Sequence, residues 1–250
     1  MRYIKGFWMA LGMFCGIPLP LPVWDEKLMP VMVAALPPVG AIIGAIWWAA
    51  GLLLVTLNPP LMLGAAILTV VPFFAAGFIH LDGYMDTSDA LLSRRPMQDR
   101  LRILKDPRVG AFAVVMLAIL FLLKFGAMYS VAESGRYLAL LIVICVISRS
   151  GSALSILVLR HMPESGYASM LAGKAGVGHK IFVVTFGMGA IMLAALYAGL
   201  AGLIVSGAVI VGYALAMRVA YKSMGGVSGD LLGYALVISE LCGLIALALL

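Results

Sequence analysis

The sequence predicts an all-α protein: a polytopic integral membrane bundle of about seven transmembrane helices, with a short N-terminal interfacial or re-entrant segment. Two observations predict this fold class. Hydrophobic residues make up 64% of the 250 residues and charged residues only 11%, whereas a soluble domain carries about 25% charged residues. The apolar residues also form runs of about 20 residues, the length that a membrane-spanning helix requires. The chain length suits a single membrane-embedded domain over residues 1–250.

The apolar runs follow one another with short breaks. Pro37 and Pro38 predict a kink near the start of the first run, and Pro59 and Pro60 predict a stop and a restart before the second. The expected spans cover residues 30–56, 60–80, 109–131, 137–160, 180–199, 201–221 and 230–250.

The N-terminal run at residues 6–23 differs from the others because it is short and interrupted by prolines. We therefore expect it to lie at the membrane interface or to re-enter the membrane without crossing it. Basic residues precede this run, as in a signal peptide, but no small-x-small cleavage site follows. We expect the run to remain in the mature protein.

The positive charges predict the orientation in the membrane. The net charge is +6, and most Lys and Arg residues lie near the N-terminus or in residues 94–108, 160–180 and 218–222. Seven spans place those segments on one side, which the positive-inside rule makes cytoplasmic. We therefore attribute the basic character to loops near membrane lipids rather than to binding of nucleic acid, and we expect the chemistry at the cytoplasmic face.

Three carboxylates in eight residues form the most informative motif. Asp82, Asp86 and Asp89 follow a long apolar run. On a helix, Asp86 lies about 40° from Asp82 and Asp89 about 20° on the other side, so the three share one stripe. Such a stripe suits a hard cation such as Mg²⁺, which carboxylates bind together with substrate phosphates. The alternative is a solvated polar helix end.

His80 abuts the acidic stripe but points about 160° away from it on a helix. A histidine here could act as a general base or a metal ligand, and a hydrogen-bonding role at the helix end is equally compatible with the sequence.

Basic residues follow the acidic stripe directly. Lys105 and Arg108 flank Asp106 and Pro107 and are the best candidates for contacts to phosphate. The alternative is a basic loop that faces anionic lipids.

Arg149 and Glu240 stand out among the charges inside predicted spans. Arg149 is in the middle of one span and Glu240 is about ten residues into the last. They mark either a binding site or a structural ion pair across the bundle.

A glycine-rich loop precedes the last span and contains Gly225, Gly226, Ser228 and Asp230. Its glycines would let the backbone approach a phosphate. Asp230 is either a cap of the following helix or part of a second ligand set that faces the acidic stripe.

These motifs together resemble the cobalamin (5′-phosphate) synthase family. The resemblance rests on His80-Leu-Asp-Gly-x-x-Asp-Thr-x-Asp-Ala, Lys105-Asp-x-Arg-x-Gly-Ala, and Gly225-Gly-x-Ser-Gly-Asp with the later Glu240. It covers most of the chain. In two places the sequence departs from the family pattern: Phe78 stands near His80 where the family tends toward a glycine pair, and Ser228 stands where Thr is common.

The resemblance implies a Mg²⁺-dependent transferase in the bacterial inner membrane. It implies that adenosylcobinamide-GDP and α-ribazole, or α-ribazole 5′-phosphate, give adenosylcobalamin or its 5′-phosphate and GMP. Carried onto this sequence, it implies that Asp82, Asp86 and Asp89 hold the metal and that Lys105 and Arg108 neutralise phosphate. Arg149, the glycine-rich loop and Glu240 would complete the binding site, with His80 as the base.

Two other functions remain open at this point. A phosphotransferase of the CDP-alcohol type also carries aspartates on membrane helices, but its motif requires Asp-Gly-x-x-Ala-Arg, whereas Asp82 and Gly83 are followed by Tyr84, Met85 and Asp86. A cation-coupled transporter would use the acids as an ion site, but transporters bind near the midplane and contain repeats. The acidic cluster lies near one face and the sequence contains no evident repeat.

Overall fold

The structure, a computed structural model, describes residues 1–17, 24–162, 165 and 175–250. Within those residues the regular secondary structure is helical, apart from one isolated parallel bridge between His161 and Val227. Six helices of this part are long and apolar enough to cross a membrane, and a seventh span results if α4 and α5 are counted as one bent pair. The predicted fold class is therefore confirmed.

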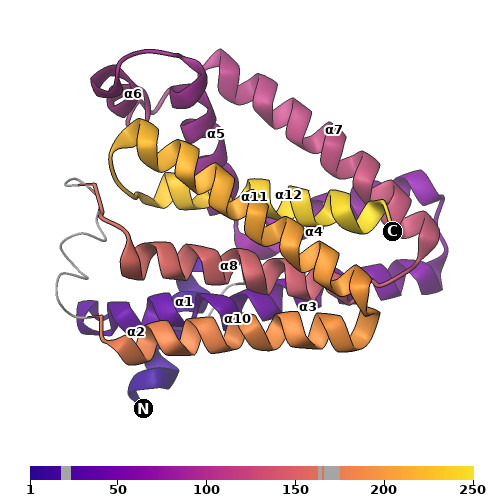
Figure 1. Cartoon of the computed structure of the whole chain (residues 1–250). Helices are drawn as coiled ribbons and strands as arrows, with labels where there is room; N and C mark the ends of the chain where they lie inside the picture. The colour runs from indigo at the N-terminus through magenta and orange to yellow at the C-terminus, as the bar shows by residue number, and fades with distance from the viewer. Residues whose placement is uncertain (18–23, 163–164, 166–174) are drawn as a thin grey trace.

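The long helices form the body of the bundle (Figure 1). Helix α12 is its centre because it packs against α5, α7, α8 and α11. Helix α8 is the most buried of the long helices, followed by α12. The bounds are α3 (Leu36–Leu57), α7 (Ala111–Ser134), α8 (Leu140–Val158), α10 (Val177–Ala198), α11 (Leu200–Met224) and α12 (Gly229–Ala248).

Shorter elements complete the bundle. Helix α1 has 13 residues, too few to cross the hydrocarbon core of about 30 Å. This agrees with the expected interfacial segment, although residues 18–23 of that segment lie outside the described part. The bounds are α1 (Arg2–Phe14), the 3-10 helix η1 (Glu26–Leu28), α2 (Met29–Ala34), α4 (Leu61–Ala76), α5 (Ile79–Leu92) and α6 (Met97–Ile103).

The predicted continuous span over residues 60–80 is wrong. Helix α4 ends at Ala76, and α5 leaves it at an angle of 97°. Gly77 and Phe78 cause the bend because both adopt left-handed backbone conformations, with φ of +70° and +64°. Such a conformation is costly for a bulky residue such as Phe78. The bend gives the acidic stripe a helix of its own.

Two glycines bring α3 against α8. A Cβ atom at Gly40 would lie 2.5 Å from the Cys145 carbonyl oxygen, and one at Gly44 would lie 2.5 Å from the Ile142 Cα. The four-residue spacing puts both glycines on one face, as in small-xxx-small helix pairs of membrane proteins. This contact lets α8 lie deep in the bundle.

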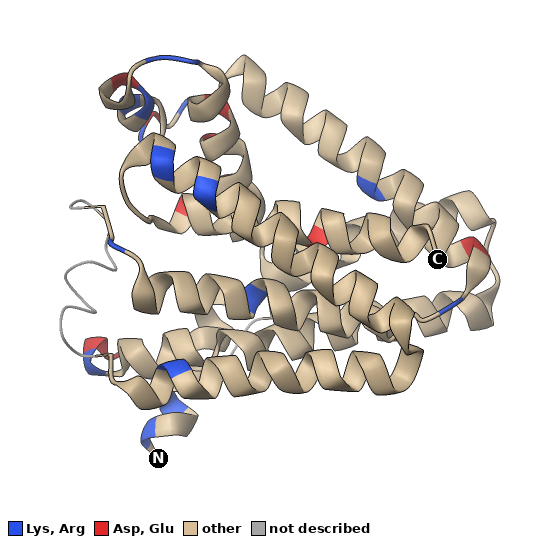
Figure 2. Cartoon of the chain, viewed as in Figure 1, with Lys and Arg blue, Asp and Glu red and all other residues tan. Residues whose placement is uncertain are grey.

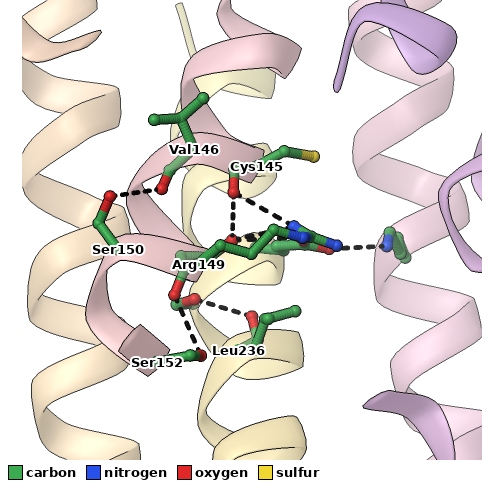
Figure 3. A network of polar contacts seen from close by, with 10 residues as sticks. Cys145, Val146, Arg149, Ser150, Ser152 and Leu236 are labelled. Atoms are coloured by element: carbon green, nitrogen blue, oxygen red, sulfur yellow. Dashed lines mark hydrogen bonds and ion pairs between the residues drawn. The ribbon is translucent and has the colours of Figure 1, made fainter. Parts of the chain in front are cut away.

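A buried ion cluster joins α7, α8 and α12. The Arg149 Nη1 lies 2.6 Å from the Glu240 Oε1, and the Lys124 Nζ lies 3.9 Å from the Glu240 Oε2. All three side chains are almost fully buried. Arg149 also donates to the Cys145 carbonyl oxygen at 3.2 Å, and Ser148 donates to Glu240 at 3.3 Å. Figure 3 shows the Arg149 side chain reaching out of α8 toward a neighbouring helix.

The Lys124 ammonium group, the second cation of this cluster, lies over two aromatic rings. The Lys124 Nζ lies 4.0 Å from the centroid of the Phe73 ring and 5.1 Å from that of Trp47. The ring faces attract a cation, which compensates in part for the excess of positive charge around one carboxylate. Sequence reasoning considered a pair of Arg149 and Glu240 but missed Lys124. Its position inside the span at residues 109–131 was the available signal.

The glycine contact between α3 and α8 predicts a stability difference. Gly44→Ala would force the α8 backbone away, so we expect a loss of about 1–3 kcal/mol in the free energy of unfolding. Gly126→Ala on α7 is the matched control, because its Cβ would meet nothing within 4 Å. That change should leave stability unchanged or raise it by about 1 kcal/mol. Thermal unfolding of the purified variants in detergent measures both, and equal midpoints would contradict the packing argument.

The ion cluster predicts unequal effects of removing its members. Glu240→Gln leaves two buried cations without a counter-ion, so we expect a loss of about 3–5 kcal/mol. Lys124→Met leaves the Arg149–Glu240 pair intact and should be considerably milder. Denaturant unfolding in mixed micelles compares the two variants. A larger loss for Lys124→Met would show that Glu240 is not the centre of the cluster.

Candidate functional site

Helix α5 carries the acidic stripe as predicted. It begins at Ile79 and contains Asp82, Asp86 and Asp89. The carboxylates of Asp82 and Asp89 lie close enough to Asp86 to repel its charge, and so does that of Asp230 from α12. The site therefore gathers four acids from two helices.

Asp230 reaches this stripe because α5 and α12 touch through glycines. A Cβ at Gly83 would lie 2.7 Å from the Asp230 Cα. In the same interface, a Cβ at Gly233 would lie 2.8 Å from the His80 carbonyl oxygen. Ser228 caps the start of α12 by accepting a hydrogen bond from the Leu231 backbone NH. Ser228 is therefore the cap of α12, and Asp230 lies near the acidic stripe.

A cavity of about 720 Å³ opens beside these acids. Apolar residues of α1 and α6, among them Phe14 and Leu101, supply further parts of its wall. Most of the predicted site residues line it: His80, Asp82, Lys105, Arg149, Gly225, Ser228 and Asp230.

Three basic residues from different parts of the chain line the cavity. Lys105 follows α6, Arg149 extends from α8, and Arg160 follows the end of α8. From the sequence, Arg160 is only one of the basic residues of the segment 160–180. A signal in the sequence was its place directly after a span, on the same predicted side as the acidic stripe.

Backbone pairing holds the end of α8 against the glycine-rich loop. The Val227 NH donates to the Arg160 carbonyl oxygen at 3.0 Å, and the Met162 NH donates to the Val227 carbonyl oxygen at 3.1 Å. A Cβ at Gly226 would lie 2.7 Å from the Met162 nitrogen, so Gly226 serves this contact and does not line the cavity. Gly225 ends α11 with φ of +76° and does line it.

Other predicted residues lie outside the cavity wall. Glu240 is deeper in the bundle and holds Arg149 in place. Asp86 and Asp89 continue the stripe beyond the cavity, and the Asp89 carboxylate packs directly against Gly110. In the described part of the chain, no three His, Cys, Asp or Glu side chains are already placed to chelate a metal ion.

Arg108 also points away from the cavity. Its guanidinium pairs with the Asp106 carboxylate at 2.8 Å, and its side chain is 87% exposed. Hydrogen bonds from Arg108 lower the pKa of Asp106 to about 2, so this carboxylate stays ionised and keeps the pair formed. Lys105, not Arg108, is therefore the basic residue of this segment that reaches the cavity.

His80 lines the cavity together with Asp82. Its ring stacks on Phe14, with centroids 6.0 Å apart. The Nδ1 atom is buried and has no hydrogen-bond partner among the described residues. His80 and the first acid of the stripe thus share one cavity despite the predicted angle between them.

Comparison with known proteins assigns the family. Residues 6–248 match the family model described as cobalamin-5-phosphate synthase. A relative from Clostridium botulinum (strain Alaska E43 / Type E3) is 35% identical over 98% of this chain and 97% of its own length. One from Clostridium perfringens (strain ATCC 13124) is 36% identical over 99% and 98%, and one from Pseudomonas fluorescens (strain SBW25) is 30% identical over 97% and 99%.

All three relatives carry the name adenosylcobinamide-GDP ribazoletransferase. No solved structure matches this chain. The extent of the family match and the identity over nearly the full length of the relatives show that the chain belongs to the cobalamin-5-phosphate synthase family, whose named members are transferases of cobalamin synthesis.

Proposed function

We propose that this protein joins adenosylcobinamide-GDP to α-ribazole, or to α-ribazole 5′-phosphate. A ribose hydroxyl oxygen forms a bond to the phosphorus that stays on the corrinoid, and the bond between the two phosphates breaks. GMP leaves, the hydroxyl loses its proton, and adenosylcobalamin or its 5′-phosphate is the product. The names of the relatives and the chemistry of the cavity support this reaction.

One observation carries the proposal. Asp82 and Asp230, from two helices, line the same cavity as Lys105, Arg149 and Arg160. Phosphoryl transfer needs mainly positioning and neutralisation of charge on phosphate oxygens. A cavity with acids on one wall and cations on others provides both kinds of group.

The chemistry of the acids suits a Mg²⁺ ion, because carboxylate oxygens are the ligands that Mg²⁺ uses together with substrate phosphates. Asp82, Asp89 and Asp230 lie close enough to Asp86 to repel its charge. Among the described residues no three acids are already placed to chelate the ion, so substrate phosphates would have to supply further ligands. Asp82, Asp86 and Asp89 would hold the ion, with Asp230 opposite them. A bound Mg²⁺ would neutralise charge that develops on the diphosphate.

The cations orient the diphosphate. Lys105 and Arg160 lie on the cavity wall and attract phosphate oxygens, and Gly225 and Ser228 let the backbone of the loop approach them. Arg149 is a positioned cation, because the buried Glu240 carboxylate fixes its guanidinium. Glu240 thus acts through Arg149 and not on the substrate.

His80 is the group that we assign to the proton of the attacking hydroxyl. Its Nδ1 atom has no hydrogen-bond partner within the described residues, so in the neutral tautomer with the proton on Nε2 this nitrogen would be the acceptor. Stacking on Phe14 fixes the plane of the ring at the cavity wall.

The proposal places the protein in the inner membrane of a bacterium, with the cavity toward the cytoplasm. Long apolar helices make it a multi-pass membrane protein. Most Lys and Arg residues gather at the end of the bundle that holds α6 and the end of α11 (Figure 2), and positive charge is retained on the cytoplasmic side.

The metal role predicts a changed Mg²⁺ requirement. Asp82→Asn and Asp86→Asn should lower GMP release from adenosylcobinamide-GDP and α-ribazole by about 100-fold or more at limiting Mg²⁺. Chromatographic assay of GMP across a Mg²⁺ titration measures this. Asp99→Asn on α6 is the control, because Asp99 pairs with the exposed Arg102 at 3.5 Å and is not among the described residues that line the cavity. Full activity of both site variants at limiting Mg²⁺ would refute the metal role.

The cavity wall predicts different roles for two neighbouring cations. Lys105→Gln should lower kcat/KM by roughly 10- to 100-fold because a phosphate contact is lost. Arg108→Gln should stay within about threefold, because that side chain is engaged with Asp106 at the surface. Steady-state kinetics at saturating Mg²⁺ compares them. The reverse order would mean that Arg108 turns into the site when substrate binds.

A further inference from the structure

A second cavity, which has the form of an open groove and is called the groove below, lies on the other side of α8, away from the candidate active site. Its volume is about 640 Å³, and residues of α8, α10 and α11 line it. In Figure 1, α10 and α11 diverge from their common turn, and α8, which contacts both, lies between them. It shares no lining residue with the cavity of the active site.

Away from its charged end the lining is mostly apolar, and the hydroxyls of Ser150, Ser155 and Tyr213 are hydrogen-bonded. The Ser150 hydroxyl donates to the Val146 carbonyl oxygen at 2.8 Å. The Tyr213 hydroxyl donates to the Ser155 hydroxyl at 3.1 Å. The groove therefore offers its occupant dispersion and hydrophobic contact without requiring a polar partner deep inside.

One end of the groove is positively charged. Arg218 and Lys222 lie one turn apart at the end of α11, and both side chains line the groove and are exposed. Among the described residues neither has an ion-pair partner, in contrast to Arg102 and Arg108. Figure 2 shows the basic residues of α11 gathered at this end of the helix.

The length of the groove matches one leaflet of a bilayer. On α11 the lining extends from Lys222 to Ile210, and on α8 from Leu159 to Ile147. Twelve residue steps in a helix correspond to about 18 Å, slightly more than half of a hydrocarbon core of about 30 Å. The groove thus extends from the level of the headgroups to near the midplane.

We propose that this groove binds one anionic phospholipid of the surrounding bilayer. An acyl chain would lie along α8 between α10 and α11, and the phosphate would contact Arg218 and Lys222. The apolar lining, the length of one leaflet and the two cations, which have no carboxylate partner in the described part of the chain, are together complementary to such a lipid, and less so to a neutral one. This site is separate from the proposed transferase site and does not depend on its function.

Native mass spectrometry of the full chain tests the proposal with two probes of identical acyl chains, phosphatidylglycerol and phosphatidylcholine. The wild-type chain should retain one phosphatidylglycerol under activation that removes phosphatidylcholine. Arg218→Gln with Lys222→Gln should weaken binding of phosphatidylglycerol by roughly 10- to 30-fold. Arg2→Gln with Lys5→Gln removes the same charge from exposed positions outside the groove and should change nothing.

A third variant separates the groove from its charges. Ala214→Trp fills the groove from an exposed position and keeps both cations, so it should also abolish retention of the lipid. Helix content by circular dichroism and a monodisperse elution profile establish that each variant is folded. Equal retention of the two lipids by the wild type, or an equal loss in the Arg2 and Lys5 control, would overturn the proposal. Retention of phosphatidylglycerol by Ala214→Trp would show that only the surface charges attract the lipid. It would overturn the assignment of the groove as the binding site.

Discussion

The bundle depends on one carboxylate buried between two cations. Glu240 contacts Arg149 and Lys124 from two other helices, so α7, α8 and α12 are tied together at one point. A lone charge at this depth would be strongly unfavourable. Each member therefore constrains the rotation of its helix, because a turned helix would leave a charge without a partner. The same constraint fixes Arg149 at the wall of the cavity.

Close helix contacts through glycine complete the site. Gly83 and Gly233 let α5 and α12 approach until Asp230 lies beside the acidic stripe. The ion cluster and this contact act on the same helix, α12, at different levels. Packing deep in the bundle sets the orientation of α12, and its N-terminal end then delivers polar groups to the cavity. Packing deep in the bundle thus determines where the acidic and basic side chains of the cavity lie.

The sequence predicted the class of fold and nearly all long helices, because a run of about 20 apolar residues has few alternatives in a membrane. It failed at residues 60–80, where hydropathy continues through the 97° bend. Hydropathy does not report backbone conformation, and Phe78 is an unexpected residue for φ of +64°. The helical periodicity of Asp82, Asp86 and Asp89 was a local property and was predicted correctly.

The sequence by itself determined the membrane bundle, the acidic stripe and the family, because hydropathy, helical period and motif spacing are all local along the chain. Only the tertiary structure decided that Asp230 joins the stripe, that Lys124 completes the ion cluster and that Lys105 reaches the cavity while Arg108 does not. These outcomes depend on which helices touch and how each is rotated. Contacts between residues more than a hundred positions apart, such as Lys124 and Glu240, are set by packing that no local pattern encodes.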